Sequence, residues 1–269
     1  MNWWNLSFIA VAAVSTISLQ ITQLNRRISG QTPEGDRQWV MQESARLSVL
    51  QRLPARGFGF NNLISTYTFL GFLQYFGDDV ARLAHGTGYG LTPAYFQVIV
   101  PRDPRFIQSY LYLSVGVSMF SAQPRQAITL YEKGTAAIDP SIQRYGYTVW
   151  IRKATDQLLF LGDSQGARQS YLKAAEWASI PQFKPDDLPE TQIIPNSNPP
   201  TNYITQYALG NAEWLKDNRD LSSAQIAAWQ MILNTATDRK TVEIIAQEVD
   251  KLGFKIQASA EGNGIIVPK

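Results

Sequence analysis

The sequence predicts an all-α protein made of stacked helical hairpins. Two similar segments carry this prediction, AQPRQAITLYEKGTAAIDP at 122–140 and LGDSQGARQSYLKAAEWASIP at 161–181. Each reads as a short helix with small residues on either side of a tyrosine and a proline at its end. The composition agrees, since 45% of the 269 residues are hydrophobic and 12% are aromatic, enough for a sizeable core. Because one hairpin cannot bury its own apolar face, a repeated hairpin implies a stack.

The chain begins with an apolar stretch, WWNLSFIAVAAVSTISLQITQL at 3–24, which carries no charge. As a helix, at about 1.5 Å per residue, it would cross the roughly 30 Å hydrocarbon core of a membrane. Two tryptophans would lie at one interface, and the pair Arg26 and Arg27 would lie at the other. We therefore expect a single-pass anchor at 1–27, with the rest of the protein on the cytoplasmic side. A cleaved secretory signal and an ordinary amphipathic or buried helix stay open as alternatives.

Residues 28–60 read as a juxtamembrane stalk followed by a helix. The segment ISGQTPEGDR, at 28–37, has the composition of a loop, while 39–53 shows one apolar helical face. Arginines outnumber acidic residues by six to three between residues 26 and 56, so basic character gathers beside the apolar stretch. Such arginines either contact anionic lipid or face solvent.

Paired helices are expected from residue 61 to residue 253. Capping residues, glycines and prolines place helices at 61–77, 92–100, 106–120, 124–138, 141–161, 164–180, 202–217, 222–235 and 239–252. These helices make about four hairpins. The segment 181–200 contains six prolines and is expected to be an inserted loop. The tail 254–269 contains one possible extended segment, at 265–267.

The spacing Ala-x3-Tyr-x2-Gly/Ala puts small residues on one stripe of a helix, where a neighbouring helix can approach closely. The matching residues are Ala127, Tyr131 and Gly134 in the first segment and Ala167, Tyr171 and Ala174 in the second. Together with an Asp-Pro pair before a new first helix, the pattern resembles the tetratricopeptide repeat (TPR) family. The resemblance covers roughly 61–235 and is strongest at 104–181. It departs from the family in its period, 40 residues against about 34, and in its first-helix aromatic positions, so a generic helical-hairpin solenoid is the alternative.

Signatures of enzymes are weak in this sequence. His85 is the only histidine and cysteine is absent, so a catalytic triad or a histidine-rich metal site has too few residues. GTGYG at 86–90 lacks the lysine of a phosphate-binding loop and reads as a turn between helices. The adjacent carboxylates at 78–79 and 186–187 would point about 100° apart on a helix and would not share a proton or a metal. We expect no enzymatic activity, no cofactor and no metal. The net charge of +2 is too small to indicate nucleic-acid binding.

The resemblance to the TPR family implies protein binding. Helical solenoids carry a binding groove on the concave side, and tyrosines exposed there would anchor a partner. The candidate partner-binding residues are Tyr110, Arg144, Tyr145, Tyr147 and Arg152.

The function expected from these features is that of a membrane-tethered scaffold or assembly factor for subunits of a membrane complex. Small anchored TPR proteins that help to build photosystems in thylakoids have this outline, as do bacterial proteins that assist envelope and polysaccharide machinery. Two alternatives stay open. One is a secreted or periplasmic helical protein that binds a ligand, and the other is an enzyme with an unrecognised site.

Overall fold

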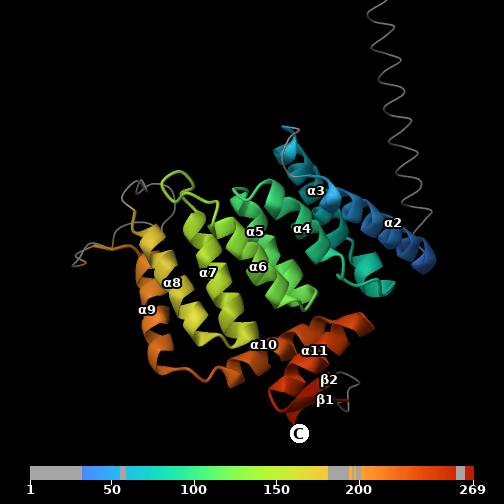
Figure 1. Cartoon of the computed structure of the whole chain (residues 1–269). Helices are drawn as coiled ribbons and strands as arrows, with labels where there is room; N and C mark the ends of the chain where they lie inside the picture. The colour runs from blue at the N-terminus through green and yellow to red at the C-terminus, as the bar shows by residue number, and fades with distance from the viewer. Residues whose placement is uncertain (1–31, 55–58, 181–193, 196, 198–200, 259–263) are drawn as a thin grey trace, which may run out of the picture.

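The computed structural model describes residues 32–54, 59–180, 194–195, 197, 201–258 and 264–269. Within these residues the chain is mostly helical, as the sequence predicts, and a small β-hairpin follows the last helix (Figure 1). The predicted anchor at 3–24 and most of the proline-rich segment 181–200 lie outside the described residues. No helix in the described part of the chain combines the length and the apolar character needed to cross a membrane.

The described part of the chain forms ten α-helices, and the middle ones stack side by side. The ten helices are α2 (Pro33–Arg52), α3 (Asn61–Phe76), α4 (Thr92–Arg102), α5 (Ile107–Leu113), α6 (Pro124–Thr135), α7 (Gly146–Asp156), α8 (Ser164–Ala178), α9 (Tyr203–Asp217), α10 (Ser222–Thr235) and α11 (Arg239–Lys251). Three π-helical segments, η1 (Val80–Ala84), η2 (Ser114–Phe120) and η3 (Gln157–Leu161), precede α4 or continue α5 and α7. Figure 1 shows α5 to α9 side by side, with α2, α3 and α4 at one side of them.

The first described helix begins earlier than the sequence predicts. Residues 33–37, expected to be part of a loop, form the first turn of α2. Thr32 caps this turn, because its side chain accepts a hydrogen bond of 3.1 Å from the Gly35 N–H. Pro33 fits the first helical position, where its missing N–H leaves no intrahelical bond unmade.

Three other helices differ from their predicted limits. α4 runs through Pro101 and ends at Arg102, because a proline in the last turn removes only one hydrogen-bond donor. The helix expected at 106–120 is α-helical only to Leu113 and π-helical beyond it. The helix expected from 141 begins at Gly146, since residues 139–145 form turns in which the Asp139 carboxylate accepts from the Ser141 N–H at 2.9 Å.

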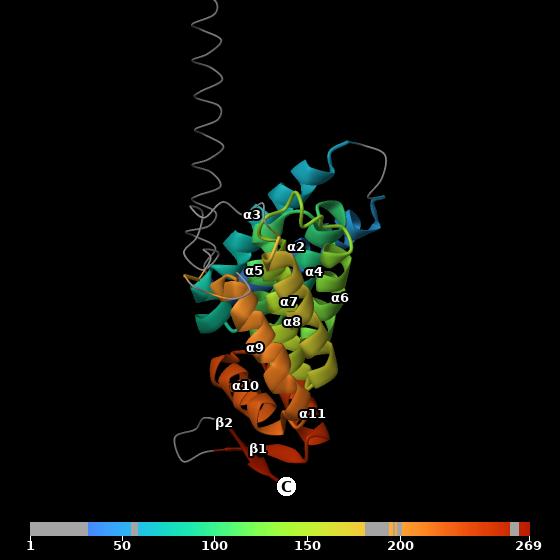
Figure 2. The same cartoon turned by 90° about the vertical axis from the view of Figure 1, so that its left-hand side faces the viewer.

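The predicted fourth hairpin does not form as a pair. α9 packs along α8, whereas α10 packs against η3, α11 and the strand β2 (Gly264–Pro268). β2 includes the extended segment predicted at 265–267, and it pairs antiparallel with β1 (Phe254–Ala258). Residues 222–258 and 264–269, here called the C-terminal unit, thus lie beneath the ends of the stacked helices in both views (Figures 1 and 2).

Aromatic rings fill the core around α3 and α4. Phe72 is fully buried, and five rings have their centroids 4.9 to 6.0 Å from its own. These rings belong to Phe69, Phe76, Tyr95, Phe96 and Tyr112. Contacts of this kind add about 0.5–1.5 kcal/mol each beyond the burial of their area.

Small residues fill the core farther along the stack. All six residues of the predicted small–tyrosine–small stripe are buried: Ala127, Tyr131, Gly134, Ala167, Tyr171 and Ala174. A Cβ added to Gly134 would lie 2.2 Å from the Tyr110 hydroxyl. The Tyr110 ring stacks on Tyr131, with centroids 6.1 Å apart, so it has no room to move away. Glycine is therefore required where the Tyr110 ring meets α6.

Two buried charged groups join elements of the stack. The Arg102 guanidinium donates to the carbonyls of Leu50 and Leu53, the latter at 3.1 Å, and so caps the last turn of α2 from α4. The Asp156 carboxyl, at the end of α7, accepts from the hydroxyl of Ser114 at 2.6 Å and from that of Ser118. Burial raises the pKa of Asp156 to about 6, although both hydroxyls lower it.

Candidate protein-binding groove

A hollow of about 580 Å³ lies over α7, between α6 and α8. Both flanking helices pack on α7, so α7 forms its floor. We call it the α7 groove. Its lining residues are Glu132 from α6, Trp150 and Lys153 from α7, Gln157 from η3, and Asp163, Gly166, Gln169, Ser170, Leu172, Lys173 and Glu176 from α8 or its cap.

A lysine and a tryptophan make the floor of the α7 groove. They stand three residues apart on α7, so they share one face of the helix. The Lys153 ammonium lies 5.3 Å from the centroid of the Trp150 ring and 3.3 Å from a Glu132 carboxylate oxygen. Only 11% of the Lys153 side chain is exposed, whereas 57% of the Glu132 side chain is. The groove therefore holds a positive charge on a mostly buried stem, beside an aromatic face.

Internal hydrogen bonds close the end of the groove near η3. The Gln157 side chain accepts from the Ser170 hydroxyl at 2.7 Å and donates to Asp163 at 3.3 Å. Asp163 in turn caps α8 by accepting from the Gly166 N–H at 2.8 Å. A Cβ on Gly166 would lie 2.1 Å from the Asp163 carboxylate, so a larger residue would disturb this cap. Recognition at this end is limited, because these polar groups already have partners.

The rim of the groove on α8 is exposed and carries both signs of charge. Lys173 and Glu176 form an ion pair of 2.7 Å with about half of each side chain or more in solvent. Exposed pairs of this kind contribute about 0–1 kcal/mol, so a partner can replace one at little cost. Leu172, also exposed, adds an apolar contact on the same helix.

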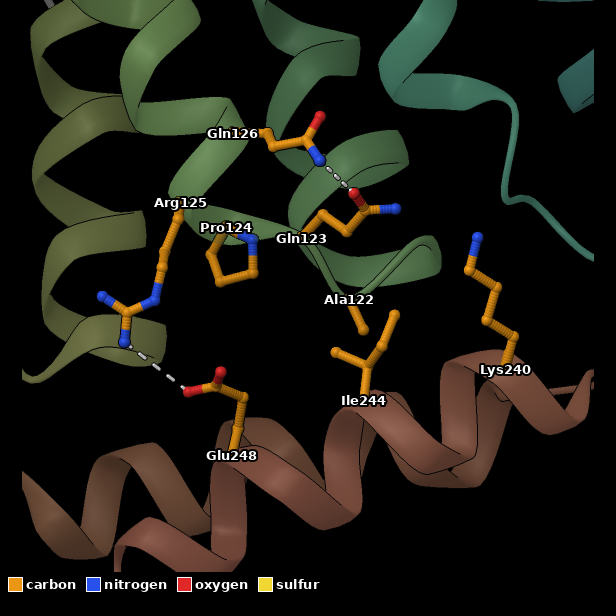
Figure 3. Close-up of a pocket in the computed structure, with 8 residues that line it drawn as sticks. All are labelled: Ala122, Gln123, Pro124, Arg125, Gln126, Lys240, Ile244 and Glu248. Carbon is orange, nitrogen blue, oxygen red and sulfur yellow. Dashed lines mark hydrogen bonds and ion pairs between the residues drawn. The ribbon is translucent and has the colours of Figure 1, made fainter. Parts of the chain in front are cut away.

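Another hollow, of about 270 Å³, lies between the start of α6 and α11 (Figure 3). Arg125 reaches across it to Glu248, with 3.7 Å between the charged atoms, and Ala122 faces Ile244. Glu248 also pairs with Lys251 at 2.6 Å. These contacts join the C-terminal unit to the stack, and we interpret this hollow as a packing seam.

None of the five predicted partner-binding residues lines the α7 groove. Tyr110 and Tyr147 are buried, with 1% and 2% of each residue exposed, so their rings present no surface to a partner and the proposed anchoring role is wrong for both. Tyr145 is exposed, and Arg144 and Arg152 are half-buried. Trp150 and Lys153 line the groove and are not among the predicted residues, although their spacing of three on one helix was a signal that the sequence offered.

The residues considered for catalysis have structural partners. His85 pairs with Asp36, which ties η1 to the start of α2. Asp78 accepts from the Ala81 N–H at 3.2 Å, while residues 186–187 lie outside the described part. The glycine-rich segment 86–90 joins η1 to α4, and its backbone is left-handed at Gly86 and Gly88. It is thus a turn between helices, as the sequence predicts. Within the described ranges, no group of three or more histidine, aspartate or glutamate side chains is placed to hold a metal ion.

Comparison with known proteins identifies no relative, since no family model, curated protein or solved structure matches this chain.

Proposed function

We propose that this chain is a non-enzymatic, membrane-tethered scaffold or assembly factor that holds a partner protein in the α7 groove. The observation that carries the proposal is the buried Lys153 on the groove floor, beside Trp150 and under an exposed rim. The Lys153 ammonium is mostly buried, but its partner Glu132 is mostly exposed. A carboxylate from another protein can therefore take the place of Glu132.

The arrangement of the helices supports a TPR-like stack. α5 with η2 pairs with α6, and α7 with η3 pairs with α8, so two successive hairpins share the buried small–tyrosine–small stripe. Grooves on stacked hairpins offer long surfaces for binding extended segments or helices of other proteins. The uncharged segment at 3–24 supplies the proposed tether, with the stack on the cytoplasmic side.

The partner that fits this groove presents a carboxylate next to an apolar side chain. The carboxylate would replace Glu132 at the Lys153 ammonium, which has three N–H donors. The apolar group would contact Trp150 and Leu172, because an aromatic floor and a leucine rim bury it from two sides. We expect this partner to be a subunit of a membrane complex, with a photosynthetic complex as one candidate.

The test is purification of the tagged full chain from membranes in mild detergent, followed by mass spectrometry of the co-purifying proteins. Lys153→Met keeps the packed stem and removes the charge, while Lys216→Met removes an exposed charge on α9, outside the groove. We expect a reproducible set of subunits with the wild type and with Lys216→Met, and a loss of about tenfold or more with Lys153→Met, as for truncating a buried charge pair. Equal recovery with Lys153→Met would refute the groove, and recovery of the chain alone would refute the scaffold.

A further inference from the structure

α3 differs from an ordinary surface helix because it carries no charged residue, although Asn62, Thr66 and Gln74 are exposed. No charged residue stands between Arg56 and Asp78 in the sequence. One side of α3 packs Phe69, Phe72 and Tyr75 into the core. The opposite side exposes large apolar side chains, which are Phe60 at 62%, Leu63 at 66%, Tyr67 at 65% and Leu70 at 53%. Steps of three and four residues place these side chains on one stripe, here called the α3 face.

Exposed apolar side chains are concentrated in this part of the molecule. Of the twenty large apolar side chains that are exposed among the described residues, ten lie between residues 39 and 83. They include Met41 and Val49 on α2 and Leu83 on η1. Single exposed leucines are normal on a soluble surface, but a continuous apolar stripe on an uncharged helix indicates a second, non-aqueous contact.

Positive charge lies beside the α3 face. The Arg46 guanidinium sits 5.5 Å from the centroid of the exposed Tyr67 ring. Glu43 holds Arg46 in an ion pair, Glu34 pairs with Arg37 and Asp36 with His85, so three acidic residues balance the three arginines of α2. Arg52 is exposed at the end of α2, and Arg26, Arg27 and Arg56 add three further positive charges in the flanking sequence. An apolar stripe flanked by arginines has the chemistry of an interfacial, anionic-lipid surface.

The chain also limits how far this surface can lie from the tether. Only eight residues separate Leu24, the end of the apolar stretch, from Pro33, the first residue of α2. A fully extended chain covers at most about 3.3–3.6 Å per residue, so α2 starts within about 30 Å of the end of that stretch. α3 follows α2 directly in the chain.

We propose that the α3 face lies on the surface of a bilayer that contains anionic lipids, with its leucines and aromatic rings at the level of the headgroups. This inference rests on the tether of the proposed function and adds to it a second membrane contact, made by the folded domain. Arg52 would then face lipid phosphates, and the α7 groove would be held at a fixed orientation to the membrane.

The absence of cysteine from the sequence permits a direct test with the full chain. Leu63→Cys and Leu70→Cys place an environment-sensitive fluorophore on the α3 face, and Leu209→Cys places it on α9, where Leu209 is exposed to a similar degree, 47%. Each labelled protein is reconstituted into phosphatidylcholine vesicles with a minority of phosphatidylglycerol, with and without brominated acyl chains. We expect the labels at 63 and 70 to shift to the blue and to be quenched several-fold more by brominated lipid than the label at 209.

The outcomes separate this inference from the proposed function. If the protein floats with the vesicles but the label at 63 is as exposed to water as the label at 209, the α3 face does not contact lipid and the inference is wrong, while the tether stands. A blue shift without quenching, together with cross-linking of Leu63→Cys chains to one another, would assign the face to a second copy and overturn the inference. If the protein does not float at all, the tether itself is refuted.

Discussion

α3 and α8 are almost equal in length, 16 and 15 residues, and both pack along the next helix of the stack, but their outer faces differ. α8 turns Ala167, Tyr171 and Ala174 inward and exposes Lys173 and Glu176, so its surface is suited to water. α3 carries no charge, and its outer side exposes Leu63, Tyr67 and Leu70 beside a few uncharged polar residues. We therefore propose that these two parts of the stack meet different surroundings, a partner protein at α8 and lipid at α3.

The largest expected effect separates the two faces of α3. Phe72→Ala removes a fully buried ring that contacts five others, and should lower the free energy of unfolding by about 3–5 kcal/mol. Leu63→Gln, on the α3 face, should change it by no more than about 0.5 kcal/mol. Denaturant unfolding of the detergent-solubilised chain measures both. If Leu63→Gln is as costly as Phe72→Ala, the outer face is part of the core and the contrast with α8 disappears.

The second prediction concerns the buried carboxyl between η2 and α7. The pKa of Asp156 is about 6 in the fold against its usual 3.8, so the neutral form stabilises the fold at low pH. That stability is present below about pH 4 and is lost as pH rises through about 6. Each unit by which the pKa is raised corresponds to about 1.4 kcal/mol, so the total loss is about 3 kcal/mol. Asp156→Asn stays uncharged, so the free energy of unfolding of the wild type minus that of the variant should fall across this range. Parallel pH profiles would show that Asp156 does not titrate in this way.

The third prediction compares two glycines. Gly134→Ala puts a methyl group against the buried Tyr110 ring and should cost about 1–3 kcal/mol. Gly210→Ala, on the exposed side of α9 with no atom within 4 Å, should stabilise by up to about 1 kcal/mol through helix propensity. Thermal unfolding of both variants is the measurement. Equal stabilisation by both would mean that the contact between the Tyr110 ring and α6 is not rigid.

Local chemistry explains which parts of the fold could be predicted from the sequence. Asp163 and Asn202 cap α8 and α9 through their own side chains, and Gly77 follows the end of α3, so these limits were predictable. The early start of α2 was not, because Pro-Glu-Gly-Asp suits a loop and a first helical turn equally well. The position of α10 was not predictable either, since its pattern indicates a helix without saying which neighbour it meets.

The site was less predictable than the fold. A single sequence shows that Tyr110 and Tyr147 are aromatic and regularly placed, but not whether they face the core or a groove. The importance of Lys153 comes from Glu132 on α6 and from the rim on α8, residues that only the packing of three helices brings together. Whether a residue lines a groove depends on the neighbouring helices. The limits of a helix, in contrast, depend on residues of that helix and its caps.

We propose that the α7 groove binds the partner and that the α3 face contacts lipid. The most direct test compares three forms of the full chain in mild detergent: wild type, Lys153→Met, and the double variant Leu63→Gln with Leu70→Gln. The proteins that co-purify with each form are quantified. We expect the amount of co-purified partner subunits to fall about tenfold or more with Lys153→Met, as for the loss of a buried charge pair. The double variant should recover the same amount as the wild type. Loss with the double variant and retention with Lys153→Met would contradict this proposal, because the α3 face would then be the partner site.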